Sequence, residues 1–204
     1  MVVRKVRGGD LREACLQEAL AIIETAGVEG LSLREVARRL GISHQAPYKH
    51  FASRDHILAE IVRRAFDSFA HYLDTHQQNG DPHAELAAMG RAYFSYAQAH
   101  PLQYRLMFGT PLPDPAQHPD MMHSARHTFT LLQACIDRMS QTLGKPTSPE
   151  NATLDALFVW AALHGLASIL QTRALDTLAL PDPVLKQAAS HILLQIGAAL
   201  GTHP

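Results

Sequence analysis

The chain has few cysteines and no long apolar run, and both shortages narrow its class. Of its 204 residues only two are cysteine. Both lie in apolar helical patterns, so we expect no disulfide framework and a reducing compartment, the cytoplasm. No segment reaches the roughly 18 consecutive apolar residues of a membrane span. Basic residues instead of an apolar run follow Met1. The sequence therefore predicts a cytoplasmic protein without a membrane partner.

The chain also has almost no net charge, but its basic and acidic residues are distributed unevenly along the sequence. The whole chain carries −1, which by itself argues against a nucleic-acid partner. Residues 1–65 contain 11 Lys and Arg against 8 Asp and Glu, whereas residues 66–204 contain 7 against 11. A basic N-terminal third is typical of a DNA-binding region, although an excess of this size is also ordinary in a short segment. The charge distribution does not choose between these two interpretations, so the sequence motifs are needed to identify a nucleic-acid partner.

Alternating β-branched runs, which indicate strands, are missing, and apolar residues recur with helical spacing. Glycine and proline interrupt this pattern at intervals that suit helix ends. The sequence predicts an all-α fold of about nine helices, with an N-terminal domain over 1–58 and a larger domain over 59–204. Approximate spans are 11–26, 32–40, 43–51, 53–79, 83–100, 102–108, a seventh helix that ends near 143, 149–175 and 183–200.

Two short helices separated by Gly41-Ile42-Ser43 form a helix-turn-helix pattern. Ser32 and Glu35 have the spacing of a capping box, in which each side chain accepts a backbone N–H of the other residue. Gly41 permits a left-handed turn. Ser43 is predicted to cap the second helix, which would lie in the major groove of DNA. The candidate contact residues on this second helix are His44, Gln45, Tyr48, Lys49 and His50.

These candidates differ in the part of DNA that suits them. Gln45 can offer a paired donor and acceptor to adenine, whereas Tyr48, Lys49 and His50 suit phosphate oxygens. Phe51 is predicted to pack in the core of the small domain. An N-terminal arm with Arg4, Lys5 and Arg7 is either a minor-groove contact or a disordered basic tail.

Residues 31–58 resemble the DNA-binding signature of the TetR family, and the match extends over residues 11–60. It includes the Tyr-x-His-Phe run at 48–51 and the serine, basic residue and leucine that follow. Pro47 replaces a commoner aliphatic residue, so we expect a slightly adjusted but unbroken helix start. Arg54 replaces the commoner lysine and keeps its charge. The resemblance implies that the contacts to DNA include Ser32, Arg34, Ser43, Tyr48, His50 and Arg54.

The C-terminal part resembles the Trp/His/Gly element of one branch of TetR C-terminal domains, on Trp160, His164 and Gly165. The first two are four residues apart and so share a helix face. They are either packed core residues or a polar handle for a bound molecule. The expected ligand is small, largely apolar, and neutral or weakly polar. The expected lining is Phe94, Tyr104, Met107, Phe108, Phe129, Trp160 and His164.

The resemblance implies a homodimeric repressor that leaves its DNA operator when a small-molecule effector binds. The last two helices are the predicted dimer interface, because they carry more apolar surface than a soluble monomer needs. This predicted seam consists of Leu154, Leu157, Phe158, Ala161, Leu185, Ala188, Ala189, Ile192 and Ile196.

Three other functions compete with this interpretation. The helix-turn-helix could serve packing only, in a helical interaction or carrier protein. A metal-responsive regulator could use His118, His123 and His127, although exposed histidines on a polar face explain them better. An enzyme is not expected, because no serine has a Gly-x-Ser-x-Gly elbow and Cys135 lies in an apolar stripe. The sequence predicts no cofactor.

Overall fold

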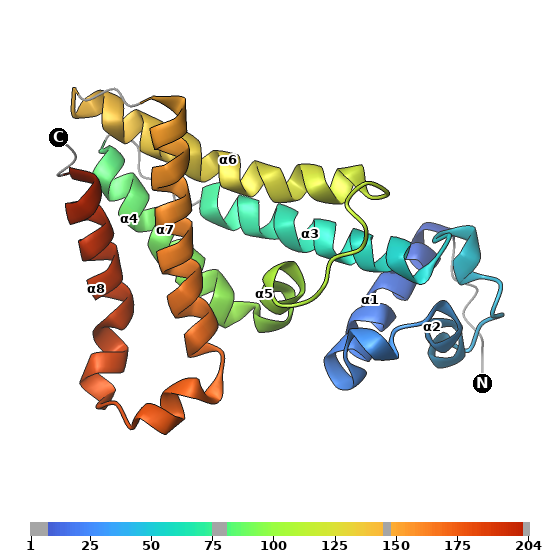
Figure 1. Ribbon diagram of the computed structural model, residues 1–204. Helices are drawn as coiled ribbons and strands as arrows, with labels where there is room; N and C mark the ends of the chain where they lie inside the picture. The colour runs from blue at the N-terminus through green and yellow to red at the C-terminus, as the bar shows by residue number, and fades with distance from the viewer. Residues whose placement is uncertain (1–7, 75–80, 145–147, 202–204) are drawn as a thin grey trace. The chain divides into compact units, whose positions relative to one another are not determined.

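The computed structural model describes residues 8–74, 81–144 and 148–201. In these ranges every regular element is a helix, so the predicted all-α fold is confirmed, with eight α-helices where about nine were expected (Figure 1). They are α1 Gly8–Ala26, α2 Leu33–Leu40, α3 Arg54–Asp74, α4 Pro82–Ala99, α5 Pro101–Phe108, α6 Pro119–Thr142, α7 Pro149–Leu170 and α8 Asp182–Gly201. Three short 3₁₀ segments join them: η1 Val28–Gly30, η2 Pro47–Lys49 and η3 Arg173–Leu178. The arm residues Arg4, Lys5 and Arg7 lie outside the described residues.

Local side-chain chemistry explains several helix ends. The Oγ of Ser32 accepts the Glu35 amide at 3.1 Å, and the Oγ of Ser53 accepts the His56 amide at 3.2 Å, so both side chains occupy free donors at a helix start. Gly41 ends α2 at φ 65°, in the left-handed region that favours glycine, as the sequence predicts.

The prediction of a third helix over residues 43–51 is wrong. Only η2 forms there, and it is preceded by a hydrogen-bonded turn over residues 44–46. Proline at position 47 has no N–H to donate, and the backbone around it makes shorter i→i+3 bonds, from Lys49 to Ala46 at 3.2 Å and from His50 to Pro47 at 2.9 Å. The expectation of an unbroken helix start therefore fails at Pro47.

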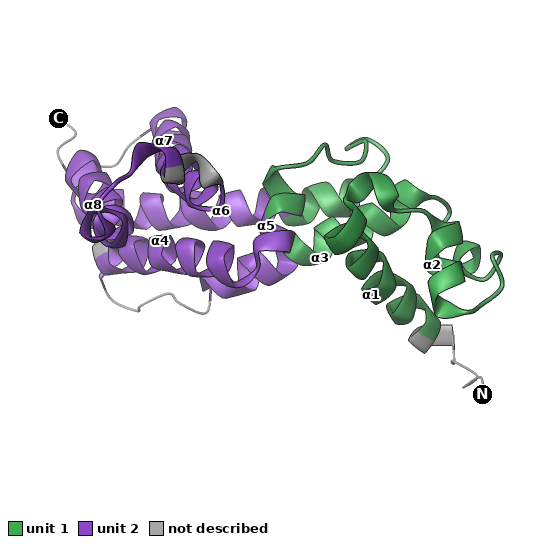
Figure 2. Cartoon of the chain, turned by 90° about the horizontal axis from the view of Figure 1, so that it is seen from below, with its two compact units in different colours: residues 1–66, 105–124 green, residues 67–104, 125–204 purple. Residues whose placement is uncertain are grey.

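The chain separates into two compact units (Figure 2). Unit 1 comprises Met1–Phe66 with Arg105–Ser124, and unit 2 comprises Asp67–Tyr104 with Ala125–Pro204. The predicted boundary at residue 58 separates a DNA-binding domain from a ligand-binding and dimerisation domain, and it stays a prediction. In unit 1 the first three helices bury a core that includes Phe51, which is 3% exposed, as predicted.

In unit 2, α4, α7 and α8 pack against one another. Gly90 on α4 marks a close approach, because a Cβ at this position would collide with the Leu193 side chain of α8. The predicted seam residue Ile196 is only 3% exposed, and it lines an apolar cavity of about 70 Å³ together with Val159 and Leu163. Ile196 therefore packs inside its own chain, which corrects its assignment to the seam.

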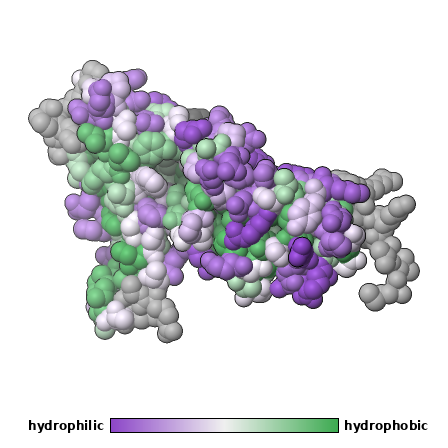
Figure 3. All heavy atoms as spheres, turned by 45° about the vertical axis from the view of Figure 1, so that its right-hand side comes forward, coloured by the Kyte–Doolittle hydropathy of each residue, from purple (hydrophilic) through white to green (hydrophobic). Residues whose placement is uncertain are grey.

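Helix α7 presents an apolar face that the described residues of the chain leave exposed. Leu154, Leu157 and Phe158 are 61%, 43% and 47% exposed, and Ala161 is exposed as well. Figure 3 shows apolar surface gathered over this part of unit 2, on the left of the view. Contrary to the expectation from sequence, α7 is long and apolar enough to cross a membrane by length and composition, and only 22% of its most apolar window is buried.

Candidate nucleic-acid interface

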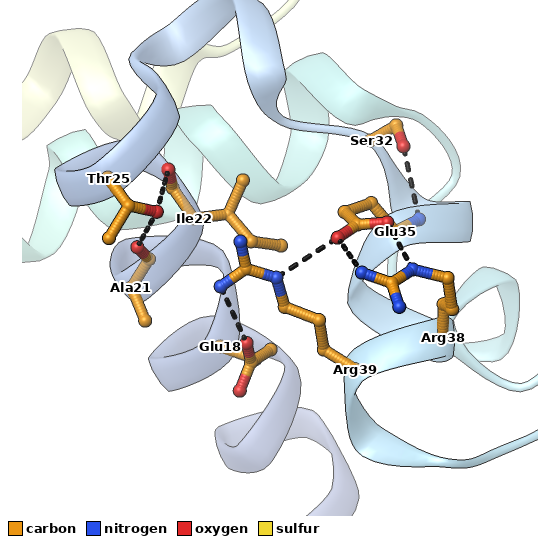
Figure 4. Close-up of polar contacts among 8 residues, drawn as sticks. All are labelled: Glu18, Ala21, Ile22, Thr25, Ser32, Glu35, Arg38 and Arg39. Carbon is orange, nitrogen blue, oxygen red and sulfur yellow. Dashed lines mark hydrogen bonds and ion pairs between the residues drawn. The ribbon is translucent and has the colours of Figure 1, made fainter.

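Helix α2 is held by a cluster of charged side chains around Glu35 (Figure 4). The Glu35 carboxylate accepts hydrogen bonds from Arg38 at 2.6 and 2.7 Å and from Arg39 at 3.0 Å. Arg39 also pairs with Glu18 of α1 at 3.5 Å. The hydrogen bonds from Arg38, followed by those from Arg39, lower the pKa of Glu35 to about 2. Glu35 thus pairs with these arginines, and only the Ser32 half of the predicted capping box is formed.

Most of the predicted DNA-contact residues are exposed at one end of unit 1. Tyr48 is the only large apolar side chain among them, and its ring is 44% exposed. His50 and Arg54 are half-buried. The exposed ones are Ser32, Arg34, Ser43, His44, Gln45, Tyr48 and Lys49.

The turn between α2 and η2 is stabilised by its own side chains. The Oγ of Ser43 accepts the Gln45 amide at 3.3 Å, a local turn contact instead of the predicted helix cap. The carbonyl of Ser43 accepts the Ala46 amide at 2.9 Å. These bonds leave the side chains of His44 and Gln45 directed to solvent, where a nucleic acid can reach them.

Arg54 makes contacts that the sequence did not predict. Its Nε donates to the Leu31 carbonyl at 3.1 Å and its Nη2 donates to the Val28 carbonyl at 2.7 Å. Its Nη1 pairs with Asp55 at 3.1 Å. The guanidinium therefore joins the first residue of α3 to the connection between α1 and α2.

A second ionic cluster in unit 1 centres on Glu60, which the sequence interpretation did not single out. Arg12, Arg63 and Arg64 all reach this carboxylate, at 3.0, 2.8 and 2.9 Å. Burial by itself would raise the pKa of Glu60, but the hydrogen bonds from the three arginines lower it to about 2. The i, i+3 and i, i+4 spacing of Glu60 with Arg63 and Arg64 was the available sequence signal.

Two family models match the chain. The model described as "Bacterial regulatory proteins, tetR family" matches residues 16–61, which hold the helix-turn-helix. The model described as "Tetracyclin repressor-like, C-terminal domain" matches residues 86–192, more than half of the chain. The chain belongs to the TetR family.

Individual relatives agree with TetR membership. An HTH-type transcriptional regulator of Mycobacterium tuberculosis is 30% identical over 124 residues, which are 56% of this chain and 53% of the relative. The chain thus spans about half the length of the first curated relatives it matches. The tetracycline repressor protein class C of Escherichia coli is 33% identical over 70 residues, 34% of this chain and 32% of the relative. A solved protein from Rhodococcus sp. RHA1 has a TM-score of 0.76 at 27% identity and covers 94% of this chain and 96% of its own.

In the TetR C-terminal domain the structure brings four polar side chains together. The hydroxyl of Tyr104 lies 2.7 Å from Nδ1 of His164, and the hydroxyl of Tyr93 lies 3.1 Å from that of Tyr104. On the other side of the imidazole, Nε2 lies 3.3 Å from the hydroxyl of Ser168. Burial lowers the pKa of His164 and raises the pKa values of Tyr93 and Tyr104. The network therefore favours uncharged members.

The sequence predicted two members of this network, Tyr104 and His164, and missed Ser168 and Tyr93. Its neighbour Phe94, which was selected, is also buried. The available signal for Tyr93 was its place beside Phe94 in the chain, because Tyr93 and Tyr104 lie on different helices, α4 and α5. The signal for Ser168 was its i, i+4 spacing from His164 on α7.

The remaining predicted lining residues divide between the two units. Phe129 and Trp160 meet edge to face at 6.1 Å between ring centroids in unit 2, and Trp160 lies at the same distance from the His164 ring. Met107 and Phe108 belong to unit 1, where Phe108 packs against Phe66 at 5.8 Å.

The predicted metal-binding histidines do not form a cluster. His118 is buried and meets the ring of His56 at 4.9 Å, whereas His123 and His127 are exposed. Among the residues that the structure describes, no three His, Cys, Asp or Glu side chains are grouped to hold a metal ion. The metal-responsive alternative is therefore wrong for these three histidines.

Proposed function

We propose that the chain is a transcriptional repressor that binds operator DNA through the exposed end of unit 1. The supporting observation is the group of polar side chains from Ser32 to Lys49 that the turn and η2 leave in solvent, in the region that matches the TetR DNA-binding model. Gln45 is assigned to base edges, and Arg34, Tyr48, Lys49 and His50 to phosphates. A repressor of this kind acts in the cytoplasm.

Gel-shift titration with the intergenic DNA beside its own gene tests this assignment. Lys49→Ala should weaken binding to all duplexes alike and reduce the salt dependence, because one phosphate contact is lost. Gln45→Ala should instead relax the preference at one or two base pairs by about 1–3 kcal/mol each. Gln98→Ala, an exposed glutamine of unit 2, is the matched control. Equal loss on every sequence for Gln45→Ala contradicts its role in reading bases.

The working form is proposed to be a homodimer that covers the exposed face of α7. Leu154, Leu157 and Phe158 form a continuous apolar stripe. In a dimer, the two copies of the helix-turn-helix can bind half-sites in successive major grooves. On α8 the exposed large apolar side chains are Val184 and Leu194, whereas the predicted Leu185, Ala188, Ala189 and Ile192 are half-buried. We therefore place Val184 and Leu194 in the α8 part of the interface.

Analytical ultracentrifugation at micromolar concentration tests the dimer. Leu157→Glu should give monomers, whereas Leu143→Glu, which changes an exposed leucine at the end of α6, should leave the dimer intact. A wild-type monomer that sediments with phospholipid vesicles would show that a membrane, not a second copy, covers α7.

The proposed effector is a small, mostly apolar molecule without net charge, bound beside His164. Its polar group would exchange hydrogen bonds with the Tyr93, Tyr104 and Ser168 hydroxyls, which surround an imidazole kept neutral by burial. A charged ligand would have to be desolvated there without an opposite charge among these four side chains. Phe129 and Trp160 supply the apolar wall.

A thermal-shift screen of uncharged aromatic and aliphatic compounds, followed by gel-shift release, tests the effector site. A ligand can displace DNA only by its different affinity for the two states of the repressor. Trp160→Ala should abolish the shift, and His127→Ala, at an exposed histidine of α6, should not. If all hits are strongly charged, the site is wrong.

A further inference from the structure

The contacts of Arg54 with main-chain carbonyls carry an inference that rests on the proposed DNA binding. We propose that Arg54 is a positioning residue that fastens the start of α2 to the start of α3, and that it does not serve as a phosphate contact. Two donors of one rigid guanidinium reach Leu31 and Val28, residues 23 and 26 positions earlier in the chain. Such a bridge sets the spacing between two helix starts.

Helix electrostatics give no other reason for a cation at this position. Arg54 is the first residue of α3, and the N-terminal end of a helix carries partial positive charge, which disfavours arginine. Asp55 offsets part of this cost through its pair with Nη1. The two carbonyls provide the compensating contacts, because a carbonyl accepts a stronger hydrogen bond from a charged donor than from a neutral one.

The atoms that Arg54 holds lie immediately before the proposed DNA contacts. The Val28 carbonyl also accepts the Leu31 amide at 3.1 Å, and Leu31 is 2% exposed. Ser32, the next residue, caps α2. Release of Leu31 would therefore move the start of α2 and the neighbouring Arg34, while the turn and η2 keep their own hydrogen bonds.

The substitution Arg54→Lys distinguishes a phosphate contact from a positioning residue. Lysine keeps the positive charge but lacks the planar guanidinium with its separate donor nitrogens. An ammonium group presents its donors from one point on a flexible stem and cannot reproduce two parallel contacts from a planar guanidinium. A phosphate contact tolerates lysine, whereas a single ammonium nitrogen has to reach both carbonyls from one point and should hold them less well. Arg34→Lys is the matched control, since Arg34 is exposed and is assigned to phosphate.

The experiment compares both variants with the wild type on duplexes that the wild type selects from a random pool, and on non-specific DNA. Arg54→Lys should bind the selected duplex about tenfold more weakly, as expected for loss of a charge-assisted hydrogen bond, with non-specific affinity unchanged. Amide exchange should rise over residues 28–34. Arg34→Lys should retain affinity and exchange rates.

Wild-type affinity of Arg54→Lys on the selected duplex, with unchanged exchange, overturns the proposal. So does a fall of about 0.9 in the salt slope for Arg54→Gln, which is the signature of one lost phosphate contact. Arg54→Gln also serves if the lysine variant does not fold. If the wild type selects no duplex, DNA binding itself fails, while amide exchange still reports whether Arg54 fastens residues 28–34.

Discussion

In unit 1 the side-chain contacts around the proposed DNA surface are charged, whereas those around His164 in unit 2 are neutral. Glu35 and Glu60 each collect two or more arginines, and their pKa values fall to about 2. Around His164 burial favours the uncharged imidazole and hydroxyls. Charged pairs cost little near water and attract or repel phosphate, while neutral hydrogen-bonding groups suit a site that must exclude ions. The contrast supports the proposed polyanionic partner of unit 1 and the proposed uncharged ligand of unit 2.

The largest effect is expected from removal of the imidazole from the neutral network. His164→Leu leaves the hydroxyl of Tyr104 without its imidazole partner, which should lower the free energy of unfolding by about 2 kcal/mol. In a chain of this length the Tm should fall by roughly 4–8 °C. Calorimetry of His164→Leu beside His127→Leu, which changes an exposed histidine of the same unit, measures the difference. Equal stability of the two variants would mean that the network contributes nothing to the fold.

A smaller loss is expected when the Glu60 cluster loses its charge. Glu60→Gln leaves Arg12, Arg63 and Arg64 without the carboxylate that they share. We expect a decrease of about 1–2 kcal/mol, because hydrogen bonds to charged groups contribute at this level. Urea unfolding should show this decrease for Glu60→Gln and none for Glu24→Gln, an exposed glutamate of α1. If Glu60→Gln lowers the free energy of unfolding more than His164→Leu does, the charged cluster of unit 1 contributes more to stability than the neutral network of unit 2, contrary to this prediction.

Acid should affect the two units in different pH windows. Because burial lowers the pKa of His164 below its usual 6.5, the stability that it contributes is present above pH 6.5 and is lost as the pH falls through the pKa in the folded state. Glu60 has a pKa of about 2 against 4.5 in an unfolded chain, so its contribution is lost only between about pH 4.5 and 2. After correction for the intrinsic pH dependence of exchange, amide exchange at pH 7, 5.5 and 3.5 should therefore rise in α7 before it rises in α3. His164→Gln should remove the early rise.

Local patterns predicted much of unit 1 because its signals are short in sequence. The cap at Ser32 and the left-handed Gly41 each depend on neighbours within a few residues. Pro47 shows the limit: one missing N–H replaced a helix by a turn and η2. The contacts of Arg54 with Val28 and Leu31 could not be predicted, because they join residues more than twenty positions apart.

Long-range packing was harder to predict in unit 2. All helices of unit 2 were expected from periodicity, but the face that each one buries was only partly predicted. Leu157 is exposed as expected, while Ile196 packs beside Val159, because α8 turns that side toward α4 and α7. The Tyr93–Tyr104–His164 network gathers residues from three helices, and no local spacing specifies such a meeting.

The smallest effect on stability is expected at Glu35, and it distinguishes folding from DNA binding within unit 1. Glu35→Gln removes an exposed acceptor, and exposed ion pairs contribute little to stability, so the Tm should stay near that of the wild type. The same change frees Arg38, leaves Arg39 paired with Glu18 alone, and removes one negative charge beside the proposed DNA surface. Non-specific DNA affinity should then rise, with a steeper salt dependence. Fluorescence anisotropy with a random duplex at several salt concentrations measures both quantities. Unchanged affinity together with a lower Tm would show that the Glu35 cluster serves only the fold.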